Sequence, residues 1–545
     1  MAYADYSKLK VLIVDDFDNF RMAVSKMLQE YGARDVDTVS NGRQALQLCS
    51  ENRYDLILCD YNLGTGKNGQ QVLEELRHRR LLPPQCLFVL VSAESSKNVV
   101  MAAYDCEPDD YLAKPVTTRA LRQRLDRLLK RRDALAPIHK AIESDDADVA
   151  IGLCRQHIDA NTRYAGMCQK LLGNLYCQRG DYAQAEEVYQ TVLAQRSLDW
   201  ALVGMAEVKR AQGNLLSAQQ WLEEALTVNP LYMKAYDVHA DLLREQGSSE
   251  RLQKVLMESA ETSPLSILRQ QRLADVAAAN NDLMVAAEAY KRAVRLSEHS
   301  CFERADDYLN LGRSVASLWE QNQEQAKSLS RDALKALTEY DQRFAKSPEV
   351  KAQRMLVECQ LSAGQGDTLK SERLLAEAEE LLESVPLNGL DIDMERVQAY
   401  HAIGQKDKAQ TLLRELVQRH DGDEEQLQRL DRLLQVPASK KNRQLVAEIN
   451  RKGIACYNAG EYADAIEHFS LALRKFPYHL GIRLNLAQAQ LDQIQAHEPT
   501  EAALADARGM LAFVGEHIEA RHEQLPRYRQ LLDMLKQCER KASSS

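Results

Sequence analysis

The sequence predicts an α/β domain with a doubly wound parallel sheet, followed by a long all-α region. Near the start, short runs of Val, Ile and Leu without polar alternation occur at 11–14, 56–59 and 87–91. Such runs are typical of parallel strands that helices cover on both faces. Beyond Arg132 these runs disappear, and apolar residues recur at helical spacing between short turns. The chain is therefore expected to change fold class near residue 132.

Acidic and polar residues follow the predicted strands where each strand ends. Asp15 and Asp16 follow VLIV, Asp60 follows LILC, Ser92 follows LFVLV, and Lys114 lies in YLAKP. In a doubly wound sheet, the residues beyond the carboxyl ends of the strands meet in one crevice. The spacing therefore predicts that these five side chains form one site.

The chemistry of this set suits a divalent ion and a phosphoryl group. Three carboxylates form a hard, oxygen-rich and negative pocket, for which Mg²⁺ is the expected ion. With the ion bound, Asp60 becomes a nucleophile towards phosphorus, while Lys114 and Ser92 contact the phosphoryl oxygens. The sequence thus predicts acyl-phosphate chemistry at Asp60.

Residues 8 to 132 resemble the receiver domain of bacterial two-component response regulators, on the spacing of these residues and on the run DDYLAKP. The resemblance implies a flavodoxin-like domain with five strands. It also implies that Asp60 accepts the phosphoryl group, and that Asp15, Asp16, Asp60 and the Asn62 backbone carbonyl bind Mg²⁺. A histidine kinase or a phosphotransfer protein is the implied donor.

Other roles follow from the same resemblance. Ser92 and Lys114 would contact the phosphoryl group, and Tyr111 would be the ring that turns inward on activation. Asn62 and Glu94 would tune dephosphorylation. The chain departs from the family pattern at 64–69, where GTGKNG adds glycines and one residue. This loop is expected to be mobile and to affect kinase docking or phosphoryl lifetime.

The helical region contains a repeat of 33 or 34 residues. Gly180, Gly213, Gly247 and Asn281 mark turns at intervals of 33, 34 and 34 residues. Copies at 166–199, 200–232, 233–266, 267–300 and 446–479 resemble the tetratricopeptide repeat (TPR), a helix pair that stacks into a solenoid. The resemblance implies a groove that binds another protein.

Four segments are therefore expected. They are a receiver at 1–132, a first TPR block at 133–300, an irregular TPR-like region at 301–445, and further repeats with capping helices and a short tail at 446–545. The helix predicted at 117–132 leads into the repeats with only Pro137 interrupting, so the receiver is expected to dock near the solenoid.

Composition restricts the other classes of function. The chain has 545 residues and a formal net charge of −10, and it shows no helix-turn-helix motif and no P-loop. We therefore expect no binding to nucleic acid. No apolar run approaches the length of a membrane span and no secretory signal is visible, so no membrane partner is expected. The eleven cysteines lack metal-ligand spacing, which fits reduced thiols and a cytoplasmic protein.

The predicted function is a response regulator of a phosphorelay that signals through TPR-mediated protein binding. The chain is not expected to be an enzyme beyond its own phosphoryl uptake and hydrolysis. Two alternatives stay open at this point: a phosphoryl sink or kinase-binding inhibitor, and an enzyme with an unrecognised domain in 301–445. The pattern does not decide between a monomer and a homo-oligomer.

Overall fold

The structure is a computed structural model that describes residues 4–94, 96–344, 346–384, 389–496, 501–518 and 521–542. The chain divides into two compact units. The first unit contains residues 1–276 and 289–307, and the second contains residues 277–288 and 308–545. The predicted tail at 543–545 lies outside the described residues.

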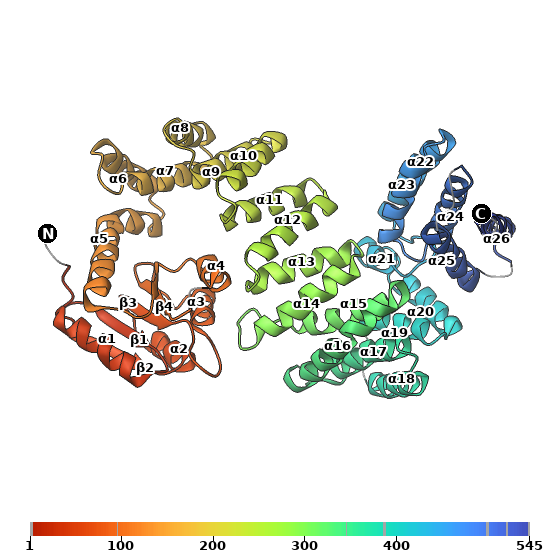
Figure 1. The fold of residues 1–545 in the computed structure, drawn as a ribbon, viewed down its shortest axis with the longest axis horizontal. Helices are drawn as coiled ribbons and strands as arrows, with labels where there is room; N and C mark the ends of the chain where they lie inside the picture. Colours follow the sequence, from red (N-terminus) through yellow and green to blue (C-terminus); the bar gives the residue numbers. More distant parts are fainter. Residues whose placement is uncertain are drawn as a thin grey trace. The chain divides into compact units, whose positions relative to one another are not determined.

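The first unit begins with a five-stranded parallel sheet of order β2-β1-β3-β4-β5, which confirms the predicted doubly wound fold (Figure 1). The strands are β1 (Lys10–Val14), β2 (Asp35–Val39), β3 (Leu56–Asp60), β4 (Leu87–Ser92) and β5 (Asp110–Ala113). Strands β1, β3 and β4 are almost fully buried, as their unbroken apolar runs predict. Strand β2 is a half-exposed edge strand of sequence DVDTV, which has no such run.

Helices cover both faces of this sheet. They are α1 (Asp18–Glu30), α2 (Gly42–Glu51), α3 (Gly69–His78), α4 (Lys97–Asp105) and α5 (Thr118–Glu143). On one face, Leu28 of α1 and Leu125 of α5 pack in a core with strand residues. On the other face, Ala45 of α2 and Leu73 of α3 do the same.

Helix α5 is a single helix of 26 residues that belongs to two cores. Its first half contributes Leu121 and Leu125 to the core of the sheet. Its second half contributes Leu135 and Ile138 to the core of the following helices. Pro137 lies inside this helix and does not end it, contrary to the interruption expected from the sequence. The two folds therefore share one helix instead of a linker.

The remainder of the first unit consists of consecutive helix pairs. The helices are α6 (Ala147–Asp159), α7 (Ala165–Arg179), α8 (Tyr182–Leu193), α9 (Asp199–Ala211), α10 (Leu215–Val228), α11 (Met233–Glu245), α12 (Ser249–Thr262), α13 (Ile267–Ala279) and α14 (Leu283–Ser297), and α14 extends into the second unit. The four predicted turn residues from Gly180 to Asn281 all have positive φ. Each predicted copy between 166 and 300 contains one helix pair.

Close packing between these helices depends on glycine beside an aromatic ring. A Cβ atom on Gly173 would lie 2.5 Å from the Tyr189 ring, and one on Gly204 would lie 2.4 Å from it. Tyr189 of α8 therefore fills the space between α7 and α9, and both helices approach it at a distance that only glycine permits. In the copy predicted at 446–479, a Cβ atom on Gly453 would likewise lie 2.5 Å from the Phe469 ring.

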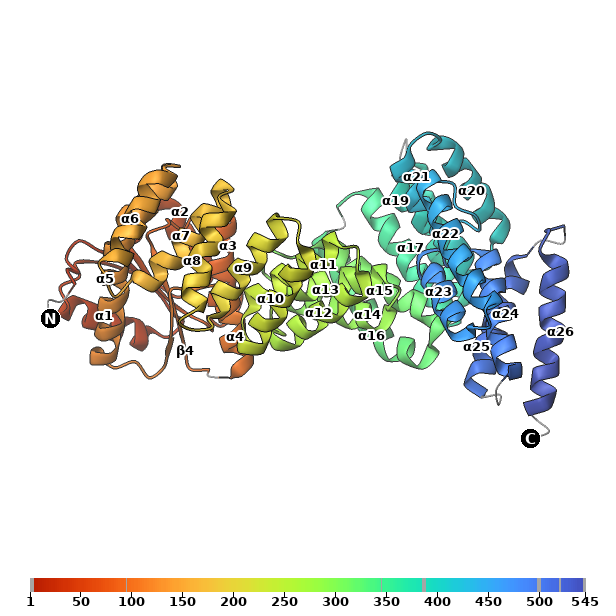
Figure 2. The same cartoon turned by 90° about the horizontal axis from the view of Figure 1, so that it is seen from above.

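The second unit is helical in its described residues. Its helices are α15 (Ala305–Gln321), α16 (Gln323–Arg343), α17 (Pro348–Gly364), α18 (Thr368–Glu383), α19 (Leu390–Ala402), α20 (Lys406–Arg419), α21 (Glu424–Leu430), α22 (Lys440–Asn458), α23 (Tyr462–Lys475), α24 (Leu480–Ala496), α25 (Glu501–His517) and α26 (Leu525–Ala542). Helices α24, α25 and α26 share one core, which contains Leu484, Leu511 and Leu535 (Figure 2). Among the described residues, no helix has the length and apolar character of a membrane span.

Candidate functional site

The parallel sheet brings the predicted site residues to one edge. Asp15 directly follows β1, Asp60 and Ser92 end β3 and β4, and Lys114 directly follows β5. Asp60 pairs with Val91 in the sheet, and Ser92 pairs with Ala113. The carboxyl ends of four neighbouring strands therefore supply the site residues, as expected for a doubly wound parallel sheet.

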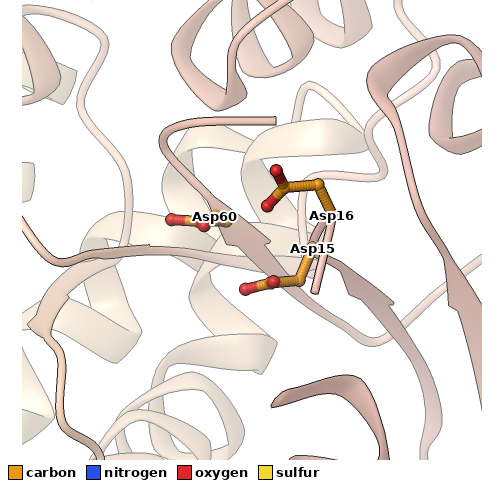
Figure 3. Close-up of side chains that lie close together, drawn as sticks. All are labelled: Asp15, Asp16 and Asp60. Atoms are coloured by element: carbon orange, nitrogen blue, oxygen red, sulfur yellow. The ribbon is translucent and has the colours of Figure 1, made fainter. Parts of the chain in front are cut away.

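Three carboxylates form the centre of the site. Figure 3 shows Asp15, Asp16 and Asp60 beyond the ends of two neighbouring strands, and one oxygen of each lies within 4.8 Å of the others. Asp15 and Asp60 are buried, whereas Asp16 is exposed. Lys114 Nζ lies 2.7 Å from a carboxylate oxygen of Asp15 and 2.7 Å from one of Asp60. Three carboxylates facing one ammonium leave a formal excess of two negative charges.

This donor set fits Mg²⁺. Carboxylate oxygens are hard ligands, the excess charge matches a divalent ion, and the exposed Asp16 leaves access from solvent. Asp15, Asp16 and Asp60 would hold the ion. The Asn62 carbonyl stays a predicted ligand. The Asn62 backbone N–H donates to the Asp60 carboxylate, and its side-chain Oδ1 accepts from the Gly64 N–H at 3.2 Å.

The environment of Asp60 and Lys114 affects both protonation equilibria. Burial raises the pKa of Asp60, and the hydrogen bond from Lys114 acts in the opposite direction. Burial lowers the pKa of Lys114, but its hydrogen bonds to Asp15 and Asp60 outweigh this effect and raise it overall. Lys114 is therefore an ammonium at neutral pH and supplies a fixed positive charge beside Asp60.

Ser92, Glu94 and Tyr111 form a connected group next to Asp60. The Glu94 N–H donates to Ser92 Oγ at 2.9 Å, and the Tyr111 hydroxyl donates to the Glu94 carbonyl at 2.6 Å. Ser92 is buried, with 2% exposure. Burial raises the pKa of Tyr111, and a hydrogen bond with Ser92 opposes the shift. A change at Ser92 would therefore reach Tyr111 directly.

The loop after Asp60 has more contacts than its composition suggests. It ends in a capping box in which Asn68 and Gln71 bond each other's backbone N–H. Lys67 Nζ pairs with Glu75 at 2.7 Å. A Cβ atom on Gly69 would lie 2.1 Å from the Asp60 carbonyl oxygen, so α3 begins against Asp60. The structure thus adds local anchors to a segment that was expected to be mobile.

Two residues at this site were not predicted from the sequence. Lys114 Nζ lies over the Phe20 ring, 4.2 Å from its centroid. Arg21 donates to the Asp15 carbonyl and forms an ion pair with Asp18. Both residues lie in the first turn of α1 after Asp16, but no spacing rule used on the sequence distinguishes them from ordinary helix residues.

Comparison with the sequences of known proteins gives the same assignment for the α/β part of the chain. Residues 11–126 match the response regulator receiver domain. The chemotaxis protein CheY-3 of Vibrio cholerae serotype O1 is 28% identical over 129 residues, which are 23% of this chain and 93% of that protein. The solved structure of Vibrio cholerae CheY4 has 28% identity and a TM-score of 0.21, and it covers 22% of this chain and 98% of its own.

A further relative is the regulatory protein VanRB of Enterococcus faecalis. It is 34% identical over 128 residues, which are 24% of this chain and 56% of that protein. The similarity thus spans about half of VanRB and about a quarter of this chain. Residues 11–126 of this chain belong to the response regulator receiver domain family.

Proposed function

We propose that this chain is a response regulator that is phosphorylated on Asp60 and signals through protein binding on its helical repeats. The observation that carries the proposal is the contact of Lys114 with both Asp15 and Asp60 beside the exposed Asp16. This arrangement combines a nucleophilic carboxylate, a fixed positive charge and a divalent-ion site, which phosphoryl transfer requires.

The reaction would begin with a phosphohistidine on a histidine kinase or phosphotransfer protein. An Asp60 carboxylate oxygen attacks phosphorus, the P–N bond breaks, and the imidazole leaves with a proton from solvent. Lys114 and Ser92 hold the phosphoryl oxygens. When bound, Mg²⁺ neutralises charge on the carboxylates and the phosphoryl group. Water later attacks phosphorus and the P–O bond to Asp60 breaks, and Asn62 and Glu94 would tune that step.

The helix pairs support the second half of the proposal. Neighbouring helices pack closely through glycine–aromatic contacts, such as those of Gly173 and Gly204 with Tyr189, which supports the TPR resemblance. Such stacked pairs present a groove that binds a peptide or a helix of a partner. We infer no further catalytic activity, so the chain would catalyse only its own phosphoryl uptake and hydrolysis.

The test is phosphorylation with a small donor. Full-length protein is incubated with Mg²⁺ and acetyl phosphate, and its intact mass is measured. We expect one acid-labile phosphoryl group on the wild type, none on Asp60→Asn, and one on the control Asp421→Asn, whose side chain is exposed in the other unit. Chelation of Mg²⁺ should abolish uptake. An equal adduct on wild type and Asp60→Asn would contradict the proposal.

A further inference from the structure

The receiver domain contacts the helical repeats at a second place besides α5. This second contact joins α3, its preceding loop and the end of α4 to residues 259–269 and 296–302, and the residues of both stretches belong to the first compact unit. The repeats of a solenoid need contacts only with their neighbours. A contact between residues so distant in the chain is therefore not one that the stacking of helix pairs supplies.

One half of this contact is a buried ion pair between Asp105 and Arg269. Arg269 Nε and Nη2 each lie 3.0 Å from an oxygen of Asp105, which is bidentate geometry. The side chains of Arg269 and Asp105 are only 10% and 8% exposed. Ser263 Oγ donates to Asp105 at 2.6 Å. Charge-assisted bidentate bonds of this kind are strong and geometrically specific.

On the side of the helical repeats, other residues hold the Arg269 guanidinium in position for a carboxylate. Arg269 Nη1 donates to Asp237 at 2.7 Å and to Ser259 Oγ at 2.8 Å. These bonds hold the guanidinium in place from the side opposite Asp105. Removing Asp105 would leave a buried Arg269 with one of its two carboxylate partners, which is costly for a desolvated charge.

The other half of the contact is at the carboxyl end of α14, where Leu296 is in the last turn and Glu298 and His299 directly follow the helix. Gln71 Nε2 donates to the carbonyls of Glu298, at 3.0 Å, and Leu296, at 3.4 Å, and Lys67 Nζ donates to the His299 carbonyl. The last carbonyls of a helix lack partners within the helix and carry partial negative charge. A cation and an amide from α3 and its loop are therefore suitable partners for them. His78 of α3 adds an edge contact with the Phe302 ring.

The residues of the second half lie directly after the phosphoacceptor in the chain. The Asn62 N–H bonds the Asp60 carboxylate, Lys67 follows five residues later, and Gly69 packs on the Asp60 carbonyl. A phosphoryl group on Asp60 adds negative charge and new acceptor oxygens at the start of this loop. The loop thus joins the chemistry at Asp60 to the contact at His299.

From this geometry, and on the basis of the proposed function, we propose that Lys67, Gln71 and Asp105 form an intramolecular clasp on Arg269 and residues 296–299, which phosphorylation of Asp60 releases. In the closed state, the helices from α6 to α14 are held by the receiver at both ends, through α5 and through the clasp. Release would leave only the α5 end attached. The curvature of these helix pairs, and with it their groove for a partner, would then be free to change.

The test uses hydrogen exchange of the full chain with and without acetyl phosphate and Mg²⁺, with intact mass measured on the same sample. We expect phosphorylation to increase exchange at least several-fold in peptides covering 67–78 and 263–302. Peptides covering α7 and α8, 165–193, should exchange as before. Full phosphoryl uptake with unchanged exchange in 263–302 would overturn the clasp. Absence of uptake would instead overturn the proposed function, and the clasp is then judged by the variants.

The variants test the contact without any phosphoryl group. Asp105→Arg places two guanidinium groups together and should raise exchange in 263–302. Adding Arg269→Asp restores a pair of opposite charges at this contact and should recover part of the protection, because the introduced carboxylate also faces Asp237. Lys67→Ala removes the bond from the lysine to the His299 carbonyl, one contact of the other half, and should raise exchange in 289–302. Glu30→Arg, an exposed position on α1, is the control and should have no effect. Wild-type exchange in both Asp105→Arg and Lys67→Ala would refute the clasp.

Discussion

At the scale of single residues, the site is defined by how closely the chain approaches Asp60. Lys114 contacts Asp60 and Asp15 with equal distances of 2.7 Å, and Gly69 lies against the Asp60 carbonyl. The contact of Lys114 with the two carboxylates is electrostatic, and the positions of these residues after the predicted strands predict it. The contact of Gly69 is steric, because the start of α3 has room only for a hydrogen atom at that position.

Gly69→Ala is therefore expected to damage the site. Its Cβ would lie 2.1 Å from the Asp60 carbonyl oxygen, so the backbone must shift. We expect a loss of about 1–3 kcal/mol in the free energy of unfolding of the receiver, typical of overpacking, with slower phosphoryl uptake. Urea unfolding and intact-mass kinetics measure both effects.

The matched control for this change is Gly152→Ala. Gly152 lies inside α6 and a Cβ atom there would have no neighbour within 4 Å. Because alanine favours helix over glycine by about 1 kcal/mol, this change should leave stability equal or slightly higher. If Gly69→Ala behaves like Gly152→Ala, the close approach at Asp60 is not a real constraint.

At the scale of secondary-structure elements, half-buried histidines make one helix contact sensitive to pH. His401 at the end of α19 lies beside His517 of α25, with ring centroids 6.1 Å apart, and both belong to the second unit. Among the described residues, His401 Nε2 is buried without a hydrogen-bond partner. Burial, with a smaller contribution from His517, lowers the pKa of His401 to about 4.

The sign of the pH dependence follows from this shift. An unfolded histidine binds a proton near pH 6.5, whereas folded His401 binds it near pH 4. Between these values the unfolded chain binds more protons, so stability falls as pH falls from 6.5 to 4. Hydrogen exchange of peptides from α19 and α25 in urea should show lower stability at pH 5 than at pH 7.5.

His401→Phe removes the titrating group while keeping a ring beside Tyr478. We expect the difference in stability between pH 5 and pH 7.5 to become smaller in this variant. The two proteins should be similar at pH 7.5, where His401 is neutral. An unchanged difference between the two pH values would show that other groups control the acid sensitivity of this contact.

At the scale of the whole molecule, the charge of the chain restricts its partners. Acidic residues number 80 and basic residues 70, and the formal net charge is −10. Three basic residues of α5 are paired with carboxylates, Arg124 and Arg127 with Asp110 and Arg131 with Asp109. Nucleic-acid affinity depends on cations that neutralise phosphates.

We therefore predict that the protein does not bind duplex DNA. A gel-shift assay at submicromolar protein and low salt should show free DNA only, with or without acetyl phosphate. Low salt is the stringent condition, because it strengthens any electrostatic binding. A salt-dependent shift under these conditions would show that a cationic surface forms in the full-length protein.

The sequence by itself determined the parallel sheet and the composition of the site. Unbroken apolar runs identify buried strands. The geometry of a parallel sheet then places Asp15, Asp60, Ser92 and Lys114 at the carboxyl end of the sheet, independently of the loop conformations. The helix pairs were predictable for a similar reason, because their turn residues recur at a fixed spacing along the chain. Edge strand β2 had no such signal, since its half-exposed residues form no apolar run.

Only the tertiary structure decided how the domains are joined within the first unit. Helix α5 continues through Pro137 because its second half is buried against the following helices, a gain that exceeds the local cost of proline. Asp105 meets Arg269 across 164 residues, and Lys67 meets His299 across 232. Contacts at such separations depend on the path of the whole chain between them, which no local pattern of residues encodes.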